Sequence, residues 1–258
     1  MSLKKKKKKF YVLKQIKEQQ IESLKKAAKY RREFLGNVSH ELKTPIFNIQ
    51  GYVHTLIDGA INDENVNLKY LQRTSKSIDR LIAIIDDLDS LANLESDELS
   101  IEKDNWDILD LINEILESFE VKSKLKNINL LSPTQKKPII VFAERDKISQ
   151  VLYNLISNAI KYGKTNGFVK VLIKNQKENV LISVEDNGLG VEEKNIPRLF
   201  ERFYRVDKGR SREAGGTGLG LAIVKHILEN HNEKIEVISK KNYGSKFIFS
   251  ISKNLISE

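Results

Sequence analysis

The feature that most constrains this 258-residue chain is a long apolar seam near its start. From about Tyr11 to Ile57, apolar residues recur at spacings of three, four and seven, a period that predicts one long amphipathic helix with a coiled-coil-like face. The residues of the seam are Leu35, Val38, Leu42, Ile49, Val53 and Leu56.

A second helix is predicted from about Glu64 to Glu95, on a similar seam. The polar segment 58–65 between the two helices predicts a reversal of the chain, with Asn62 and Asp63 as candidate N-caps. Two long helices joined by a short loop form an antiparallel hairpin that leaves half of each apolar stripe uncovered. We therefore expect an all-α hairpin that pairs with a second copy into a homodimeric four-helix bundle.

After Ser96 the pattern changes to alternating short strands and helices, which predicts an α/β sandwich with antiparallel strands covered on one side by helices. The expected division is 1–30 as a basic segment and coiled-coil start, 31–97 as the hairpin, and 98–258 as the sandwich. Expected helices are Ile108–Phe119, Asp146–Lys161, Val191–Phe200 and Gly218–Asn230; expected strands are Ile139–Ala143, Phe168–Lys174, Val180–Glu185, Lys234–Ser239 and Ser245–Ser252, the last two forming a hairpin.

Composition excludes several classes of protein. The chain has no cysteine, which removes disulfides and thiol nucleophiles, and no stretch reaches the roughly 20 apolar residues of a membrane span. The net charge is +9, but Lys4–Lys9 alone contribute six positive charges, so the basic character is local and does not favour nucleic acid. This lysine run suits the cytoplasmic flank of a membrane anchor upstream of Lys4, or alternatively a solvated chain end.

His40 lies on the first helix at about 180° from the centre of the seam, so its imidazole is expected to face solvent. Glu41 follows it, and Thr44 lies one turn further on the same face. Pro45 cannot donate to the carbonyl one turn earlier and is expected to kink or loosen the helix there. An accessible imidazole beside a carboxylate suits a nucleophile, although a single exposed histidine is more often without function.

Two further segments carry polar residues in suggestive positions. On the helix Asp146–Lys161, Asn154, Asn158 and Lys161 share one flank, where amide oxygens could hold Mg²⁺ and the ammonium could contact phosphates; a solvated flank is the alternative. Asp186 continues the buried face of the strand Val180–Glu185 into a turn with Gly188 and Gly190. Its carboxylate could accept a hydrogen bond from the amine of adenine, or the segment is a strand-ending turn.

A glycine-rich segment, Gly215–Gly220, opens the last predicted helix and could bind an anion with its free amides, although such a stretch is weak evidence alone. Before it, a polar, basic run to Arg212 suggests a mobile lid, and Arg202 or Arg205 could reach phosphates.

The segment Phe34–Pro45, with the sequence FLGNVSHELKTP, resembles the phospho-acceptor box of two-component sensor histidine kinases. The resemblance implies that His40 accepts a phosphoryl group on Nε2, that Glu41 orients the ring and takes the Nδ1 proton, and that Thr44 positions water in a phosphatase reaction on the partner.

The later motifs resemble, in order, the asparagine, first glycine, phenylalanine and second glycine boxes of the histidine-kinase ATP domain, whose fold is shared with gyrase B and heat-shock chaperones (the GHKL or Bergerat fold). This resemblance implies binding of ATP and Mg²⁺ and transfer to a response-regulator receiver domain at the cytoplasmic side of a membrane. It assigns Mg²⁺ to Asn154 and Asn158, and the adenine to Tyr162 and Asp186. The phosphates go to Lys161, Arg205 and the amides of Gly216, Thr217, Gly218, Leu219 and Gly220.

Three alternatives remain at this point: a degenerate kinase that acts as phosphatase or scaffold, a clamp ATPase, and, more distantly, a nucleic-acid binder. The sequence does not reveal the signal, the cognate regulator, or whether phosphorylation occurs within or between subunits.

Overall fold

The computed structural model describes residues 3–95, 101–135, 137–207 and 216–254. The chain forms two compact units, Met1–Ile82 and Ala83–Glu258. The boundary between them falls inside helix α2 (Asn67–Glu95), so the last turns of that helix belong to the second unit.

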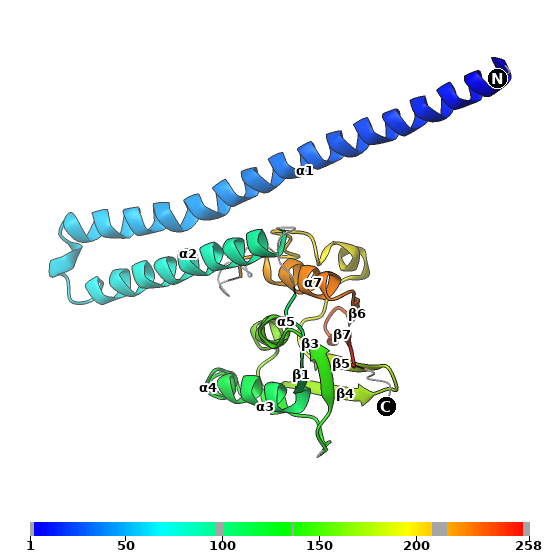
Figure 1. Cartoon of the computed structure of the whole chain (residues 1–258). Coiled ribbons are helices and arrows are strands. Elements are labelled where there is room, and N and C mark those ends of the chain that lie inside the picture. Colours follow the sequence, from blue (N-terminus) through cyan, green and yellow to red (C-terminus); the bar gives the residue numbers. More distant parts are fainter. Residues whose placement is uncertain (1–2, 96–100, 136, 208–215, 255–258) are drawn as a thin grey trace. The chain divides into compact units, whose positions relative to one another are not determined.

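The first unit is a helical hairpin (Figure 1). Helix α1 (Leu3–Ile57) is followed by a short 3₁₀ helix, η1 (Ala60–Asn62), and by the start of α2. The rings of Tyr52 and Tyr70 lie 5.8 Å apart, and further from the turn Glu41 pairs with Arg80 at 2.9 Å. An earlier residue of α1 therefore contacts a later residue of α2, so the two helices run in opposite directions. This confirms the predicted antiparallel hairpin.

The turn differs in detail from the prediction. Helix α2 begins at Asn67, three residues after the predicted start at about Glu64. Asp63, one of the two candidate N-caps, accepts the backbone N–H of Asn65 with its carboxylate at 2.9 Å and the N–H of Asn67 with its carbonyl oxygen at 3.0 Å, which is the hydrogen-bond pattern of an N-cap. The side-chain oxygen of Asn67 accepts the N–H of the next residue, Leu68. Helix α1 also starts at Leu3, earlier than expected, since lysine is a good helix former.

Part of the apolar stripe of the hairpin is uncovered in the single chain. Leu56 is 5% exposed, but Leu71 is 51% exposed and Ile78 is 43% exposed. Leu35, Val53 and Leu68 are exposed as well. The expected incomplete burial is therefore present in the first unit.

The second unit is built on a five-stranded mixed sheet in the order β2-β4-β5-β7-β6. Its edge strand β2 is parallel to β4, which departs from the all-antiparallel expectation, and the other pairs are antiparallel. The strands are β2 (Asn129–Leu131), β4 (Phe168–Asn175), β5 (Asn179–Asp186), β6 (Ile235–Lys240) and β7 (Gly244–Ser252); β1 (Asp104–Asp107) and β3 (Ile140–Ala143) form a separate antiparallel pair.

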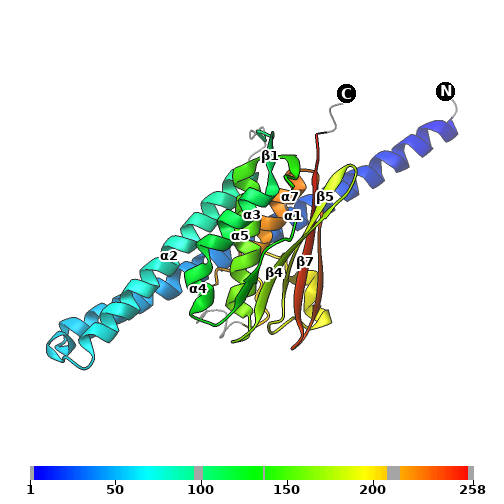
Figure 2. The ribbon, with the colours of Figure 1, turned by 90° about the horizontal axis from the view of Figure 1, so that it is seen from below.

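Helices cover one face of this sheet, as Figure 2 shows for α3, α5 and α7. They are α3 (Ile108–Ser118), the short α4 (Glu120–Lys124), α5 (Arg145–Tyr162) and α7 (Gly220–Asn230). Asp107 ties α3 to the strands, because its carboxylate accepts the N–H of Leu109 at 3.1 Å and of Ile139 at 2.9 Å. The α/β sandwich predicted for this part of the chain is confirmed.

The segment Val191–Phe200 is not the predicted α-helix. It holds a 3₁₀ helix, η2 (Glu193–Arg198), with Pro197 inside it. Pro197 has no N–H for the carbonyl one turn earlier and disfavours α geometry at Ile196, which explains the error. The lid suggested by the basic run to Arg212 lies outside the described residues.

Among the residues that the structure describes, no helix combines the length and the apolar character needed to cross a membrane.

Candidate active site

Helix α5 brings polar residues to a cavity of about 880 Å³ in the second unit. Its opposite face is buried in the core through Ile148, Val151, Leu152, Leu155, Ile156, Ala159 and Ile160, so the remaining flank must face outward. That flank carries Asn154, Asn158, Lys161 and Tyr162, and all four line the cavity. The Nζ of Lys161 lies 5.7 Å from the centre of the Tyr162 ring, which keeps a positive charge at this wall.

Asp186 ends strand β5 and lines the same cavity. It follows Val180, Ile182 and Val184 on the buried face and is only 9% exposed. One carboxylate oxygen accepts the N–H of Gly188 at 2.8 Å, and the backbone of Ser245 also donates to this carboxylate. Burial raises the pKa of Asp186 to about 6, against the opposing effect of these two hydrogen bonds. Such a carboxylate has acceptor positions left for a donor in the cavity.

The turn after Asp186 requires glycine at two places. A Cβ at Gly188 would come within 2.4 Å of the carbonyl oxygen of Tyr162, and one at Gly190 would come within 1.9 Å of the carbonyl oxygen of Lys240. Gly190 also has φ of +59°, a conformation that L side chains rarely adopt. Gly190 lines the cavity, whereas Gly188 contributes through its N–H to Asp186.

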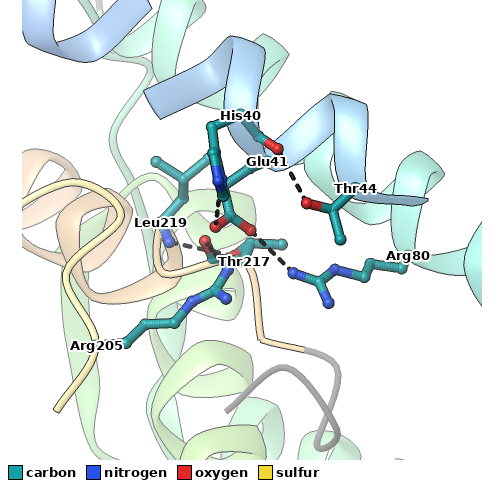
Figure 3. Close-up of polar contacts among 7 residues, drawn as sticks. All are labelled: His40, Glu41, Thr44, Arg80, Arg205, Thr217 and Leu219. Atoms are coloured by element: carbon teal, nitrogen blue, oxygen red, sulfur yellow. Dashed lines mark hydrogen bonds and ion pairs between the residues drawn. The ribbon is translucent and has the colours of Figure 1, made fainter. Parts of the chain in front are cut away.

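A second glycine segment forms another part of the cavity wall, at the start of α7. Gly216, Thr217, Gly218 and Gly220 line the cavity. Leu219 is fully buried, and its N–H donates to the hydroxyl of Thr217 at 3.2 Å (Figure 3). An amide-rich segment at the N-terminus of an 11-residue helix favours an anion.

Arg205 and Arg202 have different surroundings. The Nη2 of Arg205 donates to the carbonyl oxygen of Thr217 at 2.7 Å, and Arg205 lines the cavity (Figure 3). The Nη2 of Arg202 lies 3.3 Å from Nε2 of His226, whose pKa is lowered first by burial and then by this arginine. Of the described residues predicted for this site, Gly188, Arg202 and Leu219 do not line the cavity.

The first unit carries a separate polar cluster around His40 on α1 (Figure 3). The His40 side chain is 67% exposed, as the helical period predicted, and its Nδ1 lies 4.0 Å from Oε1 of Glu41. The other carboxylate oxygen of Glu41 pairs with Nη2 of Arg80 at 2.9 Å. The hydroxyl of Thr44 donates to the carbonyl oxygen of His40 at 3.2 Å.

Comparison with known proteins identifies both parts of the chain. Residues 30–97 match the family model of the "His Kinase A (phospho-acceptor) domain", and residues 143–255 match that of the "Histidine kinase-, DNA gyrase B-, and HSP90-like ATPase". The sensor histidine kinase WalK of Bacillus subtilis is 36% identical over 223 residues, which cover 86% of this chain and 36% of WalK. The chain thus spans about a third of the length of that relative.

Solved structures agree. The catalytic domain of the histidine kinase ThkA is 33% identical, with a TM-score of 0.53, and the match covers 59% of this chain and 96% of that domain. The chain belongs to the sensor histidine kinases. A second ThkA structure, in complex with the response regulator protein TrrA, is 27% identical with a TM-score of 0.71; the match covers 88% of this chain and 63% of the ThkA chain.

The cavity of this histidine kinase offers Mg²⁺ few protein ligands, and these are amide oxygens. In the described part of the chain, no group of three or more histidine and carboxylate residues could hold a metal by itself. Asn154 and Asn158 offer two amide oxygens, and a Cβ at Gly220 would lie 3.0 Å from Oδ1 of Asn154, so this oxygen faces the start of α7. Mg²⁺ commonly binds with few protein ligands, several waters and substrate phosphates, which fits this donor set.

Two polar residues escaped the sequence reasoning. Arg80 holds Glu41 from α2, and its only sequence signal is a charge between the apolar positions Ile78 and Leu81. Asp87, in the part of α2 that belongs to the second unit, lines the cavity and hydrogen-bonds the side chain of Thr217. Burial raises its pKa, and the charge of Asp86 acts in the same direction. In the sequence Asp87 lies beside Asp86 and close to Asp89, a pattern that is typical of a solvated acidic helix face.

Proposed function

We propose that this histidine kinase uses Mg·ATP to phosphorylate its own His40 and passes the phosphoryl group to an aspartate of a response-regulator receiver domain. The main observation behind the proposal is that the side-chain amides of α5, the buried Asp186 and the glycine segment of α7 all line one cavity. In the same chain, an exposed imidazole lies beside a carboxylate held by an arginine.

Each wall of the cavity suits one part of the nucleotide. Asp186 accepts a hydrogen bond from the amine of adenine, Tyr162 packs on the ring, and Gly188 and Gly190 keep side chains away from it. Lys161, Arg205 and the amides of Gly216, Thr217, Gly218 and Gly220 bind the phosphates, whereas the N–H of Leu219 already donates to Thr217. Arg205 is preferred to Arg202 because Arg202 contacts His226. Asn154 and Asn158 would hold Mg²⁺, which would neutralise phosphate charge.

The chemical step needs a neutral imidazole with its proton on Nδ1. The lone pair of Nε2 of His40 attacks the γ-phosphorus, a nitrogen–phosphorus bond forms, and the bond to the bridging oxygen breaks as ADP leaves. The ring then becomes more acidic, and Glu41, whose Oε1 lies 4.0 Å from Nδ1, stabilises and accepts the Nδ1 proton. Arg80 keeps that carboxylate in place.

The proposed partners follow from the surfaces and relatives described above. The ThkA complex with a response regulator supports a receiver domain as acceptor, and Thr44 would position water when the protein removes the phosphoryl group from that partner. The uncovered apolar stripe of the hairpin supports a homodimer. The run Lys4–Lys9 supports a place at the cytoplasmic side of a membrane.

The matched family ranges support the proposed division into 31–97 as dimerisation and phosphotransfer domain and 98–258 as ATP-binding domain, preceded by the basic segment 1–30.

Incubation with γ-labelled ATP and Mg²⁺ tests the proposal. We expect acid-labile, alkali-stable label on the wild type, none on His40→Gln, and normal labelling of His54→Gln, a matched change at an exposed histidine of the same helix. ATP binding without any phosphohistidine would favour a degenerate kinase, and steady ATP hydrolysis independent of His40 would favour a clamp ATPase. Either result overturns the kinase assignment.

A further inference from the structure

Ser239 on β6 lies beside the nucleotide cavity without lining it, and its hydroxyl joins three segments of the second unit. It accepts the N–H of Val191 at 2.8 Å and donates to the carbonyl oxygen of Gly244 at 3.0 Å. It also lies 2.8 Å from the hydroxyl of Ser245, its antiparallel partner on β7.

The proton positions in this network are fixed by counting. A serine hydroxyl has one proton and two lone pairs. Because the proton of Ser239 goes to the carbonyl of Gly244, the hydroxyl of Ser245 must donate to Ser239, and the second lone pair receives the N–H of Val191. All three hydrogen-bonding positions of Ser239 are therefore used.

These bonds hold the β6–β7 hairpin tip against the first glycine turn. A Cβ at Gly190 would come within 1.9 Å of the carbonyl oxygen of Lys240, and a Cβ at Gly244 would come within 1.9 Å of that of Asp186. The N–H of Asn242 also donates to the carbonyl oxygen of Leu189 at 2.6 Å. The two turns thus lie in direct backbone contact at these three points.

The contact between the two turns extends to Asp186, the residue proposed to recognise adenine. Ser245 is paired with Asp186 in the sheet, and its backbone donates to the Asp186 carboxylate. Val191 and Ser245 both line the cavity. A displacement of either segment would therefore move an N–H that orients the carboxylate or a wall of the base pocket.

We propose that Ser239 is a positioning residue for the nucleobase end of the cavity, which fixes the Asp186 carboxylate in the direction that selects a 6-amino-purine. This inference rests on the proposed function, because it assumes that Asp186 receives the amine of adenine. Adenine presents an amine where guanine and hypoxanthine present a carbonyl oxygen, so a fixed carboxylate discriminates between them.

The test compares Ser239→Ala, Ser239→Thr and the control Ser252→Ala in the full chain. Ser252 is a serine on β7 of the same hairpin, whose hydroxyl contacts Glu233 at 2.5 Å. Affinities for ADP and inosine diphosphate are measured by calorimetry, and thermal unfolding is recorded for each variant. Threonine keeps the hydroxyl and suits a strand, so it serves as the rescue variant.

We expect Ser239→Ala to weaken ADP binding about tenfold, because the N–H of Val191 loses its acceptor. Inosine diphosphate should bind with nearly unchanged affinity, so the preference for ADP falls, while Ser239→Thr and Ser252→Ala keep the wild-type preference. An unchanged preference in Ser239→Ala, or equal loss of both affinities, overturns the inference. Failure of the wild type to bind ADP would instead refute the proposed function itself.

Discussion

Glu41 on α1 and Arg80 on α2 form an ion pair in the first unit, with 2.9 Å between Oε2 and Nη2. The two side chains are only 12% and 13% exposed, so the pair is largely withdrawn from water, whereas His40 next to it is 67% exposed. Since Arg80 binds one carboxylate oxygen, the other is directed towards Nδ1 of His40. The pair therefore links the stability of the hairpin to the orientation of the proposed nucleophile.

Arg80→Gln should slow autophosphorylation about tenfold and lower the free energy of unfolding by about 1–3 kcal/mol, a range reduced from that of fully buried pairs. The physical reason is that Glu41 loses a cation in a poorly solvated place and no longer keeps one orientation. Labelling rates and denaturant unfolding measure the two effects. Arg73→Gln, at an arginine that lies 5.9 Å from the ring centre of Tyr52, is the control. Wild-type labelling by Arg80→Gln would contradict a positioning role.

Local periodicity explains why much of the site was predictable. The flank of α5 with Asn154 and Asn158 follows from the 3.6-residue period of its buried face, and the place of Asp186 follows from the alternation of β5. Both patterns depend only on residues close in sequence. The exposure of His40 was predictable for the same reason.

Contacts between distant segments were not predictable in this way. Arg80 and Glu41 are 39 positions apart in the sequence, and Ser239 and Val191 are 48 positions apart. No periodic pattern of the sequence indicates either contact. Strand β1 was missed because it is short and rich in Asp and Asn, which are depleted in strands, and β2 was missed because it has only three residues. Only pairing with β3 and β4 makes them strands.

Nucleotide affinity should depend on pH through Asp186, whose pKa is raised to about 6 by burial. The amine of adenine forms a stronger hydrogen bond with an ionised carboxylate than with a protonated one, so ADP affinity should rise from about pH 5 to about pH 7 and then level off. Asp186→Asn should bind ADP more weakly and lose this dependence. Calorimetry across the range decides the matter, and an identical profile in the variant would exclude Asp186 as the titrating group.

Asp186 should also make the free energy of unfolding of the nucleotide-free protein depend on pH. This dependence runs opposite to that of ADP affinity, because stability decreases as pH rises. Its folded pKa lies above the unfolded value, so the folded state holds the proton more tightly between about pH 4 and about pH 6. The contribution of this group to the free energy of unfolding therefore decreases as pH rises through that window. Added ADP should reverse the trend, since the ligand favours the ionised form.

His231 should stabilise the second unit as a neutral ring. It is 5% exposed, its Nδ1 lies 2.8 Å from the carbonyl oxygen of Ile227, and its Nε2 accepts the N–H of Glu144 at 3.2 Å. Burial lowers its pKa, so its contribution is present above about pH 6.5 and is lost as pH falls below that unfolded value. His231→Gln should cost about 1–2 kcal/mol at neutral pH.

The pH dependence of the free energy of unfolding distinguishes the role of His231 as a neutral ring from a role in packing alone. Thermal unfolding of His231→Gln should show a shallower loss of stability on acidification than the wild type, whereas His54→Gln, at an exposed histidine, should follow the wild type. Parallel acid profiles for wild type and His231→Gln would show that another group is responsible.

Leu71→Glu should disrupt the proposed homodimer. Leu71 is 51% exposed in the single chain although it belongs to the apolar stripe of α2, so a charge there would be desolvated at the interface. Sedimentation equilibrium should show at least a tenfold increase in the dissociation constant. Gln72→Glu places the same charge at the next, exposed position and should remain dimeric. A Leu71→Glu protein that stays dimeric would show that the dimer interface does not include Leu71.

Asp87→Asn should increase the affinity for ATP. The Asp87 carboxylate lines the cavity and hydrogen-bonds Thr217, in the segment proposed to receive the phosphates, so its negative charge opposes theirs. Because burial and the neighbouring charge of Asp86 both raise the pKa of Asp87, its negative charge is costly before ATP arrives and more costly afterwards. We expect affinity to rise about three- to tenfold. Asp86→Asn removes the same charge from an exposed position on the same helix and should change little; equal effects of the two variants would mean that only net charge matters.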